Sequence, residues 1–170
     1  MQVQRKTLTQ LSIPICFETL FYMLSGMVDT LMLSSVSDQA VGAVGTANRY
    51  ISVFIIMFGV ISSGMVAVMT QNIGAGKPGI AYQARQLGLI FNAVIGVLMS
   101  VFLAVFSGNI LRMVSIAPAL FDSANTYLRI VGGACFLNAL IPIFSSYLRV
   151  FGYTKQSLWA SIIGNVINFI

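Results

Sequence analysis

Two acidic side chains inside a long apolar stretch near the start of the chain are the first candidates for chemistry. Glu18 and Asp29 are two of only four acidic residues in the sequence. An ionisable group in a membrane is costly, so it is by default a functional hypothesis. A spacing of eleven residues is about three helical turns with an offset of about 20°. We therefore expect both carboxylates on one helix face, roughly 16 Å apart along the axis.

These carboxylates are either hydrogen-bond partners between helices or groups that exchange H+, Na+ or a cationic substrate. Asp29 is the stronger candidate for exchange, because it lies deeper in the apolar stretch than Glu18. Pro14 precedes Glu18 by four residues. A proline inside a helix removes a backbone hydrogen bond and bends the helix, unless it stands in the first turn. The sequence therefore predicts a bend before Glu18.

Polar amides in the last apolar stretch form a second group of candidates. Asn165 and Asn168 are three residues apart and share a helix face. Asparagine side chains commonly join membrane helices by hydrogen bonds, so each residue is either a link between helices or a ligand. Pro142, in the preceding stretch, predicts another bend.

The elements that position these residues follow from composition. Of the 170 residues, 58% are hydrophobic and 8% are charged, whereas soluble domains are about 25% charged. This excludes a soluble domain, and the hydrophobicity excludes disorder. Apolar runs of roughly 20 residues span a membrane, and lipid permits only helices there when the runs do not alternate. The sequence predicts an all-α integral membrane protein, a bundle of about five transmembrane helices at about 8–34, 41–70, 80–107, 120–150 and 155–170, the last incomplete.

The distribution of basic residues predicts orientation. If the helices alternate in direction, one side of the membrane carries six basic residues and the other carries three, namely Arg5, Lys6, Lys77, Arg85, Arg149 and Lys155 against Arg49, Arg112 and Arg129. Cytoplasmic loops carry an excess of Lys and Arg. We expect a multi-pass protein of the inner (plasma) membrane, with the lipid bilayer as its partner and its N-terminus in the cytoplasm.

Several classes of activity are excluded by what the sequence lacks. Histidine is absent, and Cys16 and Cys135 both lie inside apolar runs. These observations argue against His-based catalysis and a metal site, so we expect no enzyme and no cofactor. The net charge of +5 is explained by membrane orientation, so no nucleic-acid partner is expected.

Four motifs, in order along the chain, resemble those of the multidrug and toxic compound extrusion (MATE) transporters. They are Pro14 followed by Met27-Val28-Asp29-Thr30-Leu31-Met32, then Ala40-Val41-Gly42-Ala43-Val44-Gly45, then Gln71-Asn72-Ile73-Gly74-Ala75-Gly76-Lys77, and last Tyr147 to Lys155 followed by Asn165 and Asn168. Each motif alone is weak, but their order and topological positions are specific. The resemblance covers essentially the whole chain.

The resemblance implies a fold and an activity. MATE transporters have about twelve helices in two six-helix lobes around a central cavity, and they export organic cations and other compounds using H+ or Na+ gradients. Asp29 matches the family's first-helix aspartate, linked to cation coupling, and Pro14 matches a proline associated with helix bending. Asn168 fits the fifth-helix pattern. Glu18 is not among the residues that the resemblance carries over. Residues 1–170 would then be a truncated N-terminal lobe that lacks the C-terminal lobe and is inactive alone.

Two other interpretations stay open at this point. One is a short multidrug transporter that works as an oligomer, with Glu18 as its coupling carboxylate. The other is a membrane assembly subunit without transport activity. The choice between H+ and Na+ as coupling ion, and the identity of the small organic substrate, are also open.

Overall fold

The computed structural model describes residues 7–169, with side chains described from Thr7 to Ile167. This range contains six α-helices and no strand. They are α1 (Leu8–Val36), α2 (Asp38–Gly74), α3 (Pro78–Met113), α4 (Pro118–Gly133), α5 (Cys135–Val150) and α6 (Thr154–Phe169). The predicted all-helical fold is confirmed.

Four stretches of the described chain are long and apolar enough to cross a membrane. Three of them are the single helices α1, α2 and α3, with 29, 37 and 36 residues. The fourth is the pair α4 and α5, which passes the same test when the two helices, bent by 44° at their break, are counted as one span. Helix α6 has 16 residues, about 24 Å of helix, less than the roughly 30 Å hydrocarbon core. The five apolar runs thus become four candidate spans and one shorter helix.

The fourth run differs from the prediction of one helix over 120–150 with a bend at Pro142. The break is instead at Ala134, and Pro142 lies inside α5. Two glycines precede the break and weaken the helix there. At Gly132 an added Cβ would lie 2.9 Å from the Cβ of Leu103, so α4 approaches α3 closely where it ends. On the other side of the break, the Phe136 N–H donates to Ser100 Oγ at 2.7 Å, which satisfies a helix-end donor that lipid would leave unpaired.

Helices α2, α3, α4 and α5 form the core of the bundle, and small residues allow their backbones to approach. An added Cβ at Gly96 would lie 2.7 Å from the Ala139 Cβ. The fully buried Asn92 amide reaches the carbonyls of Phe58 and Ala139 at 3.3 and 3.0 Å. Small residues and side-chain amides are the usual means of joining membrane helices. Helix α1 contacts this core through α2, and α6 contacts it through α5.

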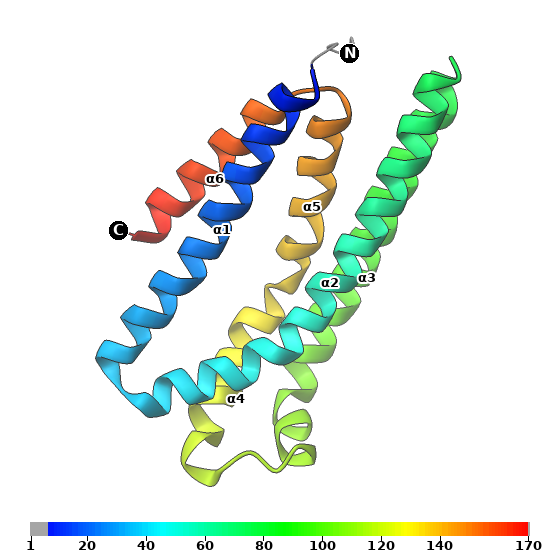
Figure 1. The fold of residues 1–170 in the computed structure, drawn as a ribbon. Helices are drawn as coiled ribbons and strands as arrows, with labels where there is room; N and C mark the ends of the chain where they lie inside the picture. The colour runs from blue at the N-terminus through cyan, green and yellow to red at the C-terminus, as the bar shows by residue number, and fades with distance from the viewer. Residues whose placement is uncertain (1–6, 170) are drawn as a thin grey trace.

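Helices α1 and α6 lie side by side, set off from the α2–α5 core (Figure 1). Pro14 is the seventh residue of α1 and is the one buried residue of this helix, which continues unbroken from Leu8 to Val36. Pro14 is therefore not a first-turn proline. Much of α1 presents exposed large apolar side chains, among them Leu20, Met23, Met27 and Leu31.

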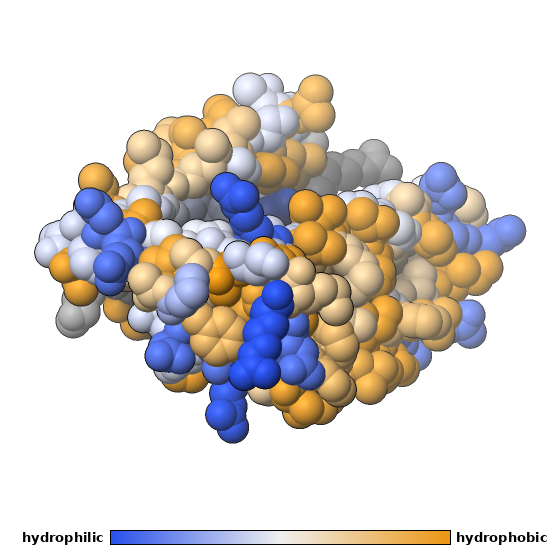
Figure 2. Space-filling model, turned by 90° about the horizontal axis from the view of Figure 1, so that it is seen from below, coloured by the Kyte–Doolittle hydropathy of each residue, from blue (hydrophilic) through white to orange (hydrophobic). Residues whose placement is uncertain are grey.

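The two connections at the end where α1 begins carry basic residues. Figure 1 places the α2–α3 and α5–α6 turns at that same end. Each turn contains a glycine with positive φ, +70° at Gly76 and +80° at Gly152, a conformation that side chains disfavour. Lys77, Arg149 and Lys155 therefore lie at one end, as predicted, whereas Arg5 and Lys6 fall outside the described residues. Viewed from the opposite end, hydrophobic side chains cover broad areas between separate hydrophilic ones (Figure 2).

Candidate cation and substrate site

Glu18, in the first half of α1, is held by two other helices. Its Oε1 accepts a hydrogen bond from the Ser157 hydroxyl of α6 at 2.9 Å. The same oxygen lies 2.9 Å from an Arg149 guanidinium nitrogen of α5. The Glu18 side chain is 13% exposed and that of Arg149 is 36% exposed. Glu18 is thus a partly buried, charge-neutralised carboxylate that joins α1, α5 and α6.

A cavity of about 640 Å³ lies beside this ion pair, between α1, α2, α5 and α6. Hydroxyl and amide groups dominate its polar lining, from Thr19, Tyr22, Ser62, Ser63, Ser145, Ser146, Ser157, Ser161 and Asn165. The hydroxyls of Ser62 and Ser63 donate back to carbonyls one turn earlier in α2. The Ser62 oxygen also accepts from the Asn92 amide, whereas the Ser63 oxygen keeps its lone pairs to accept from a ligand. Glu18 and Arg149 are the charged residues in the described lining, so the lining has no net charge.

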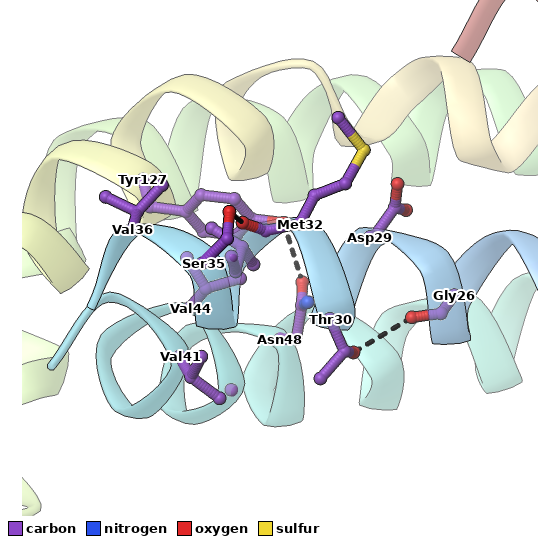
Figure 3. Close-up of a pocket in the computed structure, with 12 residues that line it drawn as sticks. Gly26, Asp29, Thr30, Met32, Ser35, Val36, Val41, Val44, Asn48 and Tyr127 are labelled. Carbon is purple, nitrogen blue, oxygen red and sulfur yellow. Dashed lines mark hydrogen bonds between the residues drawn. The ribbon is translucent and has the colours of Figure 1, made fainter. Parts of the chain in front are cut away.

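Asp29 lines a different cavity, of about 660 Å³, between α1, α2 and α4 (Figure 3). It is the one charged residue in the described lining of this cavity. Its side chain is exposed, and it makes no hydrogen bond or ion pair with any residue that the structure describes. Nearby, the Tyr127 hydroxyl donates to the Asn48 side-chain oxygen at 3.1 Å. The site therefore combines an uncompensated negative charge with an amide and a phenol.

The structure separates the residues that the sequence grouped together. Glu18 and Asn165 line one cavity, whereas Asp29 lines the other. Asn168 belongs to α6, but its side chain lies outside the described residues. Within the described residues, no cluster of three or more potential metal ligands occurs.

Sequence reasoning missed the partners of Glu18. Arg149 served there to predict orientation and as part of a motif, and was not paired with Glu18, although a carboxylate inside an apolar run calls for a counter-ion. That requirement would have pointed to Arg149, because only a few basic residues stand at the ends of the apolar runs. The serines of α5 and α6 gave no comparable signal, since serine is common in membrane helices as a packing residue.

Comparison with known proteins identifies the family. The sequence profile of the MatE family matches residues 14–170. The chain belongs to the MatE family. Its members are multi-pass membrane transporters, and the apolar helices of this MatE chain fit that description.

Individual relatives agree with this assignment. The chain is 34% identical over 162 residues to the uncharacterized transporter YisQ of Bacillus subtilis, covering 95% of this chain and 36% of YisQ. It is 29% identical over 176 residues to the probable multidrug resistance protein NorM of Thermotoga maritima, covering 96% of this chain and 35% of NorM. The MatE chain thus spans about a third of the length of these relatives.

A solved structure supports the fold. The crystal structure of a MATE protein in complex with MaD3S superposes with a TM-score of 0.86 at 19% identity, covering 92% of this chain and 35% of that one. At that identity the similarity concerns the fold alone. The MatE chain thus has the arrangement of helices found in the corresponding third of a MATE protein.

Proposed function

We propose that this chain forms part of a cation-coupled exporter, in which Asp29 exchanges the coupling ion. The observation that carries the proposal is the uncompensated charge of Asp29 in its cavity. A carboxylate without a fixed counter-ion is free to accept H+ or Na+, or to attract a cationic substrate. Glu18 is less suited to exchange, because Arg149 already neutralises it at 2.9 Å.

Small organic compounds, often cationic, are the proposed substrates. The cavity beside Glu18 offers hydroxyl and amide groups without net charge, a lining that tolerates varied molecules. The negative charge of Asp29 would draw a cation or a proton into the adjacent cavity. The name of NorM, a probable multidrug resistance protein, supports export of drugs or similar metabolites.

A second lobe and an orientation in the membrane are also part of the proposal. Alternating access needs two halves that rock around a binding site, and this chain spans about 35% of NorM. We infer that a second lobe completes the cavities, and that this segment alone is inactive. The basic residues near the α2–α3 and α5–α6 turns favour a cytoplasmic N-terminus in the plasma membrane.

The test is transport by the complete protein that contains this segment, reconstituted in lipid vesicles. Export of the fluorescent cation ethidium is measured under an imposed H+ gradient and, separately, under a Na+ gradient. We expect Asp29→Asn to abolish gradient-driven export with whichever ion drives the native protein. Asp38→Asn is the matched control, because Asp38 is an exposed carboxylate in the first turn of α2. Native export rates in Asp29→Asn under both gradients would show the proposal to be wrong.

A further inference from the structure

Arg85 of α3 lies against two tyrosine rings, whereas Arg149 is paired with a carboxylate. Its guanidinium carbon lies 4.7 Å from the ring centroid of Tyr82 and 5.0 Å from that of Tyr147. Its Nε is buried and has no hydrogen-bond partner. No carboxylate among the described residues lies within ion-pair distance of it. Arg85 is thus oriented by two aromatic rings while its charge is uncompensated.

A small groove adjoins this guanidinium. It has a volume of about 250 Å³ and lies between α2, α3 and α5. Apart from Arg85 and the two tyrosines, its lining is apolar, from Met69, Ile73, Pro78, Ala81 and Phe151. A groove with one cationic end and apolar walls fits a ligand that carries an anionic group on a hydrocarbon chain.

The length of α3 places this groove at the height of the lipid headgroups. Its 36 residues make about 54 Å of helix, which exceeds the roughly 30 Å hydrocarbon core by about 12 Å at each end if centred. Arg85 is the eighth residue of α3, about 10 Å from the helix start. It therefore lies close to the boundary between headgroups and hydrocarbon, where tyrosine is also favoured.

We propose that this groove, formed by Arg85, Tyr82, Tyr147 and the apolar residues around them, binds an anionic phospholipid. The planar guanidinium donates to the lipid phosphate, and one acyl chain lies along Met69, Ile73 and Phe151. Lys77, in the α2–α3 turn at the same end, adds positive charge. Basic pockets between helices at the cytoplasmic side are known to hold anionic headgroups. The site does not depend on which compound the protein transports.

The experiment measures the rise in melting temperature of the complete protein in phosphatidylcholine nanodiscs when phosphatidylglycerol is included. The native protein is expected to be stabilised by phosphatidylglycerol, and Arg85→Gln is expected to need about tenfold more of it for the same shift, since a charge-assisted hydrogen bond is lost. Lys155→Gln is the control, because Lys155 is exposed at the same end and outside the groove. Arg85→Lys keeps the charge but not the planar fork, and should fall between the two.

Two results would overturn the site. One is a native response to phosphatidylglycerol in Arg85→Gln. The other is an equal shift of the native protein by inorganic phosphate alone, which would indicate a soluble anion rather than a lipid. If Arg85→Gln does not fold, native mass spectrometry of the unaltered protein decides. Preferential retention of phosphatidylglycerol over phosphatidylcholine, weakened in Arg85→Lys, supports the proposal, and equal retention of both lipids contradicts it.

Discussion

The two carboxylates of α1 have opposite surroundings although they lie on one helix. Glu18 is 13% exposed and shares one oxygen with Arg149 and Ser157. Asp29 is exposed in a cavity with no described partner. Residue type and spacing do not distinguish the two, but their neighbours do. A paired carboxylate joins helices, whereas an unpaired one is available for a mobile ion.

This comparison predicts that Arg149→Gln has the largest effect on stability. The substitution would leave the Glu18 charge partly buried without a counter-ion, and loss of one partner of a buried pair costs about 3–5 kcal/mol. Because Arg149 is 36% exposed, we expect roughly 2–3 kcal/mol. Chemical unfolding of the complete protein in micelles, followed by circular dichroism, measures the change.

The double variant Glu18→Gln with Arg149→Gln is the control for that result. Removing both charges should restore part of the lost stability, because no uncompensated charge then remains. Additive losses in the double variant would mean that the pair does not join the helices as described.

Ser157→Ala should have an intermediate effect. It removes the hydroxyl that donates to Glu18 at 2.9 Å, and a hydrogen bond to a charged group contributes roughly 1.5–3 kcal/mol when well formed. Because Arg149 still neutralises Glu18, we expect about 1 kcal/mol. Ser161→Ala, one turn further along α6 and with no described hydrogen bond, is the matched control in the same unfolding assay. Equal losses in both variants would contradict a specific role for Ser157.

Tyr127→Phe, on the Asp29 side, should have the smallest effect on stability. It removes the hydrogen bond to Asn48, and such bonds between membrane helices contribute about 0.6 kcal/mol on average. We expect the same unfolding assay to give a loss of that size. Loss of several kcal/mol would mean that the Asp29 cavity is a structural centre comparable to the Glu18 pair.

The sequence predicted the helices well because the membrane imposes a simple rule of length and hydrophobicity. Its failures concern close packing. The break at Ala134 is accompanied by the close approach of Gly132 to Leu103 and by the hydrogen bond that the Ser100 hydroxyl oxygen accepts from the Phe136 N–H. Neither contact is local in sequence, so the sequence offered Pro142 as the cause of a bend in this run and did not predict the break at Ala134. The roles of Glu18 and Asp29 likewise depend on residues more than 100 positions away or on the absence of any partner.

Ion release on substrate binding distinguishes the exchanging carboxylate of α1 from the paired one. The complete protein is equilibrated in weakly buffered detergent solution, ethidium is added, and released H+ or Na+ is measured with a pH dye or a sodium electrode. We expect release from the native protein and from a folded Glu18→Gln variant, and none from Asp29→Asn. Undiminished release from Asp29→Asn, with release lost in folded Glu18→Gln, would contradict this expectation and make Glu18 the exchanging carboxylate.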